Sequence, residues 1–393
     1  MDIVIVGGGY AGLSCALRLA ARARRQGAAA RIRLIHPSPV LVERIRLHQV
    51  AAGQRLPERR IDGLLQRAGV EWVPGWAEAI EADARTVRVG GQTLHWDRLV
   101  LAVGSQAGSQ EVPGVEAHAE TLDPDRVAAL DARLAALPAG ARVLVVGGGL
   151  TAIEAASEIA QARPHLAVTL VASGRVAADF SDAGREHVLR VLRHLQVGVR
   201  EGVRVERVEA SRLVTNGGTL GVDLCVWAAG FRLPALPREA GLQVNARGQV
   251  LVDPQLRSIS HPWIYAAGDI ASPVLPPGQE LPMGCKSAMP MGAHVADNLA
   301  REWAGREPRA FDLATMFFCV SLGRRDGLIQ WADEAGRLSG RVLTGRRAAW
   351  FKETICRSTW WALLAESRGL AAVVWKRTGH APQALVPSGP VGA

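Results

Sequence analysis

Cysteine is scarce in this chain of 393 residues, and the spacing of its few cysteines excludes one kind of chemistry. There are five, widely separated, and no CxxC or CxxxxC pair occurs. An odd number of isolated cysteines supports neither a disulfide framework nor a redox-active dithiol. We therefore do not expect thiol–disulfide chemistry, and we expect no metal site.

Lysine is nearly absent. Only Lys286, Lys352 and Lys376 occur, the other basic residues are arginines, and the net charge is +9. Such a charge favours anionic partners, including dinucleotides and acidic lipid surfaces. Because the basic residues are scattered and no nucleic-acid motif occurs, we expect no nucleic-acid partner.

Long apolar runs are absent too. No run reaches the roughly 18 residues that a membrane-spanning helix requires. The chain begins directly with a predicted core strand, which leaves no room for a signal peptide. We expect a cytoplasmic protein, in contact with a membrane at most as a peripheral protein at its inner face.

Glycine, in contrast, is plentiful, and it forms a fingerprint at the start of the chain. An apolar strand over residues 3–6 is followed by Gly7-x-Gly9-x-x-Gly12 and an Ala- and Leu-rich helix. The first glycine permits a tight turn, the second lets the backbone approach a pyrophosphate, and the third lets helix and strand pack closely. The N-terminus of the helix adds free N–H groups. This stretch predicts a dinucleotide site.

A second fingerprint follows roughly 140 residues later. Residues 143–146 form an apolar strand, and Gly147-x-Gly149-x-x-Ala152 opens another helix. Two fingerprints, each in its strand–turn–helix context, are far more specific than one. The unit closes with a strand that ends at Gly230, which we expect to bind the same nucleotide. The sequence thus predicts two dinucleotide sites.

Neither unit has the acidic residue that usually ends its second strand and binds a ribose. The first unit has His36, which can still bond a ribose hydroxyl. The second has Ala172 followed by Ser173 and Arg175. Without the acid, a 2′-phosphate is not repelled, and the arginine is able to pair with one. This favours tolerance of NADPH, while Arg175 as a simple loop residue is the alternative.

These motifs, with residues 99–104 (containing Ala102 and Gly104), Glu154 and residues 266–269 (containing Gly268 and Asp269), resemble the flavoproteins with two dinucleotide-binding domains. The resemblance is to relatives of the type II NADH dehydrogenases, over about residues 1–330. It implies FAD at the first fingerprint, NAD(P)H at the second, and Asp269 at the ribityl chain of the flavin.

The fold expected from this resemblance is α/β. Two Rossmann-like domains are nested, with the NAD(P) domain (111–235) inserted into the FAD domain (1–110 and 236–310). Residues 311–393 form a small C-terminal α+β region.

Four residues are candidates for chemistry. Glu154 matches a family glutamate near nicotinamide and flavin, although an acid also suits a first helical turn. Lys286 precedes a helix predicted from near Pro290 to residue 303; it either adds positive charge beside the flavin or is an exposed loop lysine. Arg46 and His48 lie on one side if residues 41–49 are extended, whereas a helix would scatter them. They are candidates for the acceptor side of the flavin, or surface charges.

The acceptor is the least defined element. Type II NADH dehydrogenases carry a glutamine pair near residues 290–291 at their quinone site, and this chain has Met289, Pro290 and Met291. A Met-lined pocket still suits a flat aromatic molecule. The resemblance therefore implies an NAD(P)H dehydrogenase with a small aromatic or quinone-like acceptor. An FAD-dependent oxidase or dehydrogenase of a secondary metabolite and a redox-sensing flavoprotein are the alternatives.

The C-terminal region has an Arg- and Trp-rich segment predicted as a helix over residues 346–365. Basic and aromatic residues on one helix suit docking at a membrane surface. The same residues also suit packing on the FAD domain or a homodimer interface, and all three readings stay open.

Overall fold

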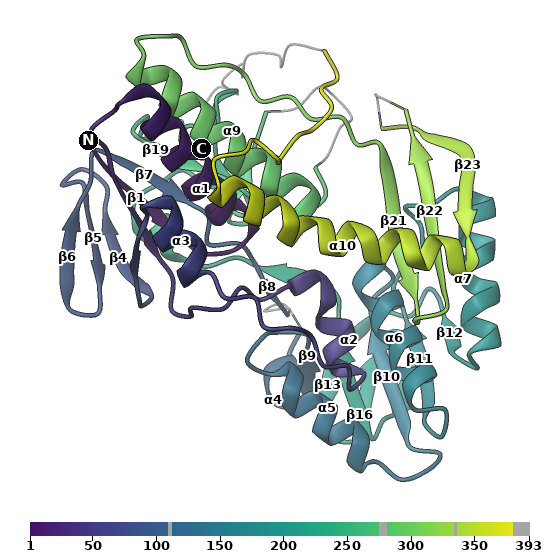
Figure 1. Cartoon of the computed structure of the whole chain (residues 1–393). Helices are drawn as coiled ribbons and strands as arrows, with labels where there is room; N and C mark the ends of the chain where they lie inside the picture. The colour runs from purple at the N-terminus through teal and green to yellow at the C-terminus, as the bar shows by residue number, and fades with distance from the viewer. Residues whose placement is uncertain (109–111, 275–280, 334–335, 380–393) are drawn as a thin grey trace, which may run out of the picture.

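The computed structural model describes residues 1–108, 112–274, 281–333 and 336–379. In them the chain builds two parallel five-stranded sheets, each with helices, and a third, antiparallel sheet beside a long helix (Figure 1). The predicted α/β fold with two Rossmann-like units and a C-terminal α+β region is confirmed.

The first parallel sheet has the order β19-β7-β1-β2-β3. Its strands are β1 (Asp2–Val6), β2 (Arg31–Ile35), β3 (Glu71–Val73), β7 (Arg98–Leu101) and β19 (Ile264–Ala266). Their apolar side chains share one core with helices α1 (Tyr10–Gln26), α3 (Asp62–Ala68) and α9 (Cys285–Trp303). Since β19 pairs with β7, the second unit is inserted between these two strands, and residues of the segment 240–256 already belong to the core of the first unit.

The second parallel sheet repeats this plan with the order β12-β11-β10-β16-β9. Its strands are β9 (Ala119–Thr121), β10 (Arg142–Val146), β11 (Ala167–Val171), β12 (Gly198–Arg200) and β16 (Leu224–Trp227), and its helices are α5 (Val127–Ala136), α6 (Leu150–Ala162) and α7 (Asp182–His194). β10 pairs in parallel with β11 and β16, as β1 pairs with β2 and β7. The two fingerprints therefore occupy equivalent places in two equivalent units.

The third unit connects the other two. The antiparallel strands β21 (Phe317–Leu322), β22 (Asp326–Ala332) and β23 (Leu338–Thr344) are followed by α10 (Gly345–Ser367). Side chains of β21 and β22 join the core of the second unit, whereas α10 also lies against α1 and α3 of the first (Figure 1). Residues from both nucleotide-binding units thus meet at α10.

The remaining elements are short. The antiparallel sheet β4 (Ala77–Glu81), β5 (Thr86–Val89) and β6 (Gln92–His95) belongs to the first unit, and β13 (Val205–Glu209), β14 (Arg212–Thr215) and β15 (Gly218–Gly221) to the second. The others are α4 (Val115–His118), α8 (Leu236–Glu239) and the two-residue strands β8 (Gln106–Ala107), β17 (Phe231–Arg232), β18 (Val250–Leu251) and β20 (Ala271–Ser272). No helix in the described ranges has the length and apolarity needed to cross a bilayer.

The helix predicted from near Pro290 begins five residues earlier, at Cys285, so that prediction was wrong. Gly284 caps it at a φ of +147°, a conformation that favours glycine. Pro290 then lies in the second turn, where it has no N–H to donate to the carbonyl of Lys286. Lys286 is consequently a residue of the first turn of α9, and not of a loop.

Residues 44–51 are helical, which decides between the two predicted geometries. A 3₁₀ turn η1 (Arg44–Arg46) leads into α2 (Leu47–Ala51). The alternation of charged and apolar residues does not produce a strand here. Arg46 and His48 are nevertheless both buried, so their reading as surface charges is wrong.

The domain boundaries remain predictions, and the boundary between residues 110 and 111 lies outside the described residues. Residues 380–393 of the predicted C-terminal region lie outside them as well. Within the described part of that region, strand β23 was not predicted from the sequence.

Candidate functional site

The first fingerprint forms a cradle of backbone at the carboxyl edge of the first sheet. Gly7 has a φ of +108°, and a Cβ atom there would lie 2.2 Å from the carbonyl oxygen of Ala102. A Cβ on Gly12 would lie 1.8 Å from the oxygen of Gly7. Around Gly9, in contrast, no protein atom lies within 4 Å of a Cβ position. The open space at Gly9 and the N-terminus of α1 fit a pyrophosphate.

His36 lies beside this cradle. A Cβ atom on Gly8 would meet the His36 ring at 2.5 Å, so the two residues are in close contact. Burial lowers the pKa of His36, which keeps the imidazole neutral at pH 7. A neutral ring has one N–H donor and one acceptor, as binding to a ribose would require.

Asp269 connects the first sheet to the start of α9. Its Oδ2 accepts a hydrogen bond of 2.6 Å from Ser105 Oγ, and its Oδ1 accepts one of 3.0 Å from the backbone N of Gly284. Gly268 precedes it at a φ of +81° and packs against Ala11 of α1. Gly104, at a φ of +66°, directly precedes Ser105. Ser105 was not predicted as a site residue.

α1 and α9 cross at very short range. A Cβ atom on Gly292 would lie 2.0 Å from the carbonyl oxygen of Ala11, so only glycine fits at the crossing. The first turn of α1, which carries the cradle, is therefore packed directly on α9, and the two helices form one wall of the first site.

The second fingerprint opens on a cavity of about 600 Å³. Gly147 has a φ of +141°, and a Cβ there would lie 2.9 Å from the oxygen of Ala228 and 3.0 Å from the Cβ of Ala152. Gly149 again has open space, and Gly149 and Gly230 line the cavity. Pro282 and Met283, which lead into α9, line its other side. The second cradle thus faces the start of α9.

The basic residue that lines this cavity is Arg204, and not Arg175. Arg175 pairs with Asp182 at 3.5 Å outside the lining. Ala172 is buried, where a Cβ on Gly148 would meet it at 3.1 Å, whereas Ser173 lines the cavity. No sequence motif predicts Arg204 as a site residue. It reaches the cavity because of the path that the chain takes after β12.

Glu154 is part of a buried ionic cluster and does not line the cavity. Its Oε1 lies 3.1 Å from Lys352 Nζ and accepts a hydrogen bond of 3.0 Å from the backbone N of Ser321. Its Oε2 lies 3.5 Å from His48 Nδ1. Burial opposes the charged form of both residues. The pKa of Glu154 is nevertheless lowered, by Lys352 and then by His48. The pKa of Lys352 is raised, by Cys319 and then by Glu154. The pair is ionic.

His48 is held neutral inside the same cluster. Burial lowers its pKa to about 4, against the opposing influence of Glu154. Its Nε2 is buried and has no hydrogen-bond partner among the described residues. A buried nitrogen without a partner is costly, which makes it a candidate to contact a bound molecule.

Arg46 is occupied by protein carboxylates. Its Nη2 donates to Glu353 of α10 at 2.8 Å, and its Nε lies 3.5 Å from Glu43. Glu353 in turn accepts from Arg357 at 2.8 Å. Arg46 therefore joins η1 to α10, and this contact gives it a structural reason for its burial.

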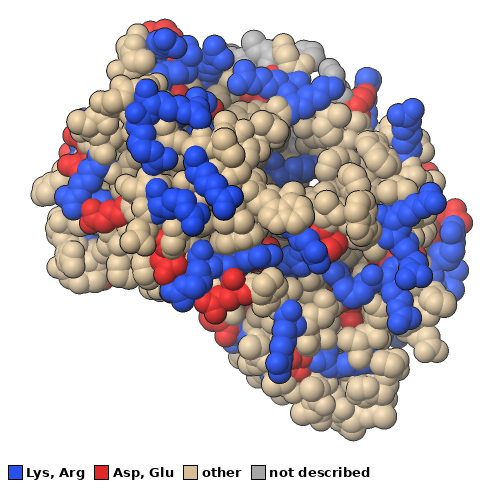
Figure 2. Space-filling model, in the orientation of Figure 1, with Lys and Arg blue, Asp and Glu red and all other residues tan. Residues whose placement is uncertain are grey.

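Lys286 lies among aromatic side chains of the third unit. Its Nζ donates to the carbonyl oxygen of Phe317 at 2.8 Å and lies 4.4 Å from the ring centre of Phe318. Phe317 makes an edge contact with Phe351 of α10 at 6.1 Å. Burial lowers the pKa of Lys286 to about 8. In Figure 2 the surface is hollowed above α10, between α9 and β21.

Lys352, Phe317 and Phe318 are site residues that no sequence motif predicts, and the scarcity of lysine is the one feature of the sequence that could have drawn attention to Lys352. In a chain that uses arginine almost everywhere, two of its three lysines, Lys286 and Lys352, are in this region. An ammonium gives up its charge more readily than a guanidinium when buried, which suits Lys286 with its lowered pKa, whereas Glu154 helps to keep Lys352 charged.

The cysteines of the region are not activated. Burial raises the pKa of Cys285 to about 11 and that of Cys356 to about 12, so both stay thiols at pH 7. All five cysteines are free. In the described ranges, no group of three metal-binding side chains comes together.

Comparison with known proteins agrees with this arrangement. A family model described as pyridine nucleotide-disulphide oxidoreductase matches residues 1–296. An NADH dehydrogenase-like protein of Mycobacterium tuberculosis is 29% identical over 327 residues, which cover 76% of this chain and 80% of that protein. A type II NADH:quinone oxidoreductase of Staphylococcus aureus is 26% identical, covering 90% and 93%.

Among solved structures, the sulfide:quinone oxidoreductase of Aquifex aeolicus has the same fold. The TM-score is 0.77 at 20% sequence identity, and the match covers 94% of this chain and 92% of that chain. This likeness extends over the third unit as well as the two nucleotide-binding units.

Proposed function

Because this chain belongs to the pyridine nucleotide-disulphide oxidoreductase family, it is an FAD-dependent NAD(P)H oxidoreductase, and we propose that it passes electrons from NAD(P)H to a small quinone-like acceptor. Both cradles accommodate a pyrophosphate by their open glycine positions. When bound, FAD would supply the group that takes hydride from NAD(P)H and passes two electrons on.

We infer the acceptor from the aromatic side chains around Lys286. Phe317, Phe318 and Phe351 provide flat apolar surface next to one ammonium group. Aromatic faces stack on a planar ring, and a nearby cation stabilises negative charge that develops on a carbonyl oxygen. A quinone has both a planar ring and carbonyl oxygens on which negative charge develops during reduction.

Lys286 is suited to more than electrostatic attraction. With its pKa lowered to about 8, a fraction of the lysine is neutral at physiological pH, and the charged form has a proton to give. A quinone takes up two protons as it is reduced, so we propose that Lys286 donates one of them. The first turn of α9 adds the positive end of its helix dipole at the same place.

We propose a positioning role for Glu154. By accepting from Ser321 it fixes β21, the strand that carries Phe317 and Phe318, to the helix of the second fingerprint. Lys352 of α10 forms an ion pair with the same carboxylate, which holds α10 there as well. The nucleotide cradle and the aromatic surface are thereby held in one arrangement, without any need for Glu154 to touch the nicotinamide.

The experiment compares Phe318→Ala and Lys286→Met with the unchanged protein, with FAD content measured first. Both variants should keep NAD(P)H-dependent bleaching of the flavin and lose about tenfold or more in the rate with benzoquinone and naphthoquinone acceptors. Ferricyanide, which needs neither stacking nor a proton, serves as the control acceptor. Equal losses with all acceptors would contradict the proposed quinone site.

A peripheral membrane contact fits this function, because many quinones are lipophilic. Trp350 and Trp361 of α10 are 70% and 54% exposed, and Leu370 and Val374 beyond it are also exposed. Trp at an interface with flanking arginines is typical of proteins that lie on membranes. A Trp350→Ser/Trp361→Ser variant should lose co-sedimentation with anionic vesicles; unchanged co-sedimentation would contradict this contact.

A further inference from the structure

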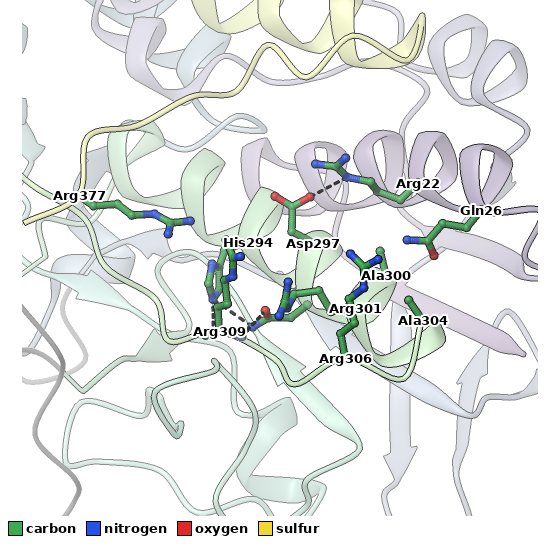
Figure 3. A pocket seen from close by; sticks show the side chains of 11 residues that line it. Arg22, Gln26, His294, Asp297, Ala300, Arg301, Ala304, Arg306, Arg309 and Arg377 are labelled. Atoms are coloured by element: carbon green, nitrogen blue, oxygen red, sulfur yellow. Dashed lines mark hydrogen bonds and ion pairs between the residues drawn. The ribbon is translucent and has the colours of Figure 1, made fainter. Parts of the chain in front are cut away.

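A pocket unrelated to either fingerprint lies between α1 and α9. It has a volume of about 220 Å³ and is formed by the last turns of the two helices, the segment 304–309 and Arg377 (Figure 3). The fingerprint is at the opposite end of α1. This volume is below the roughly 300–1,000 Å³ typical of pockets for drug-sized ligands.

The lining is strongly basic. Five arginines contribute to it: Arg22, Arg301, Arg306, Arg309 and Arg377. The one acid in the lining, Asp297, is already held by Arg22 at 2.9 Å and by Arg18 at 3.3 Å. With His294 neutral, since burial lowers its pKa to about 4, the lining carries a net charge of +4.

Only one of the five guanidinium groups, that of Arg22, is paired with a carboxylate within the described residues. Arg301 donates to a carbonyl oxygen, that of Glu307, at 2.6 Å. Arg377 lies 5.9 Å from the ring centre of Trp375. The side chains of Arg306 and Arg309 have no ion pair or hydrogen bond within the described ranges. Like charges gathered in this way repel one another unless an anion lies between them.

The pocket is also pre-formed. Buried Asn298 accepts from the backbone N of Arg309 at 2.9 Å and donates to its carbonyl oxygen at 2.9 Å. His294 Nε2 bonds the same oxygen at 2.9 Å, and its ring packs on Phe311. The backbone that carries Arg309 is thus fixed to α9 before any ligand binds, which lowers the entropic cost of binding.

We propose that this pocket binds a compact phosphate-bearing anion, either free inorganic phosphate or pyrophosphate or the phosphate of a lipid headgroup. A guanidinium group can donate two parallel hydrogen bonds to two oxygens of one phosphate. All the basic residues in the described lining, apart from His294, are arginines. The anion would bridge Arg22 of α1 to Arg306 and Arg309, which follow α9. Because α1 and α9 also make the wall of the FAD site, binding at this end stabilises that wall.

The test uses the FAD-loaded protein saturated with NAD⁺, so that neither cradle is open to the probe. Calorimetric titration with pyrophosphate should show saturable binding and a rise in the thermal midpoint. Arg306→Gln/Arg309→Gln should weaken binding by about tenfold or more, since each bond to a charged group is strong. Arg204→Gln, which alters the second cradle alone, is the matched control and should leave binding unchanged.

A parallel arm uses vesicles of phosphatidylcholine with and without phosphatidic acid. Vesicle binding that depends on Arg306 and Arg309, without saturable pyrophosphate binding, assigns the site to a lipid headgroup; saturable pyrophosphate binding assigns it to a free anion. Circular dichroism and FAD content verify that the variants fold, and Arg377→Gln provides an independent substitution. Absence of binding in both arms, or binding that the arginine variants leave unchanged, would overturn the proposal.

Discussion

Lys352 Nζ lies 3.1 Å from Glu154 Oε1, in a buried ion pair that joins the C-terminal helix to the helix of the second fingerprint. Three segments that are distant in sequence meet at this carboxylate, since His48 and Ser321 contact it too. Glu154 therefore links the helix of the second fingerprint both to α10 and to the strand that bears the aromatic residues.

Removal of one partner leaves the other charge buried, so Lys352→Met should destabilise the protein by about 3–5 kcal/mol. Glu154→Gln/Lys352→Met should be less unstable than Lys352→Met alone, because no charge is then stranded. Urea denaturation measures both. Glu186→Gln, in the exposed pair with Arg190, is the control and should change stability by less than about 0.5 kcal/mol. A double variant as unstable as Lys352→Met, or less stable than it, would contradict the coupling.

The two fingerprints could be recognised from sequence because each is a local signal of strand, glycine turn and helix. The Glu154–Lys352 pair could not, since it depends on how α10 lies across two units. One local signal misleads: Pro290 predicts that a helix begins near it, whereas α9 begins after Gly284, whose backbone N donates to Asp269. The place of Arg175 just after the second strand of its unit makes it a candidate for binding a 2′-phosphate, and the structure adds Arg204, which lines the cavity.

Substitutions at two glycines of the first fingerprint should differ in their effect on FAD binding. Gly9→Val should give folded but colourless protein, because the side chain meets no protein atom and enters the space of the pyrophosphate. Gly12→Val should instead reduce the yield of folded protein, since its Cβ would overlap the oxygen of Gly7. Absorbance spectra and thermal unfolding distinguish these outcomes. Full flavin in Gly9→Val would remove the assignment of the first cradle.

Nucleotide preference should respond to Ser173 and Arg204. Ser173→Asp places a carboxylate at the lining of the second cavity, where it repels a 2′-phosphate, so kcat/KM should move towards NADH by about tenfold. Arg204→Gln should move it in the same direction. Arg175→Gln, whose arginine pairs with Asp182 outside the lining, should have little effect. A larger effect at Arg175 than at Arg204 would contradict the described cavity.

Stability should fall as the solution is acidified from about pH 6.5 to about pH 4, partly through His48 and His294. Burial lowers the pKa of both to about 4 in the folded protein. Between the unfolded value near 6.5 and this value, the unfolded chain binds more protons, so acid favours unfolding by up to roughly 1.4 kcal/mol per pH unit for each histidine. His294→Gln should flatten the curve of unfolding free energy against pH in this range. An unchanged slope would contradict a neutral buried imidazole.

The most direct test of the central claim, that one chain holds FAD and a reducing nucleotide and delivers electrons to a quinone, is a two-step anaerobic stopped-flow measurement. NAD(P)H should bleach the flavin absorbance in the first mixing, and a short-chain quinone should restore it within the turnover time in the second. Bleaching without reoxidation by any quinone would contradict the proposed acceptor. No bleaching by NADH or NADPH would contradict the account as a whole.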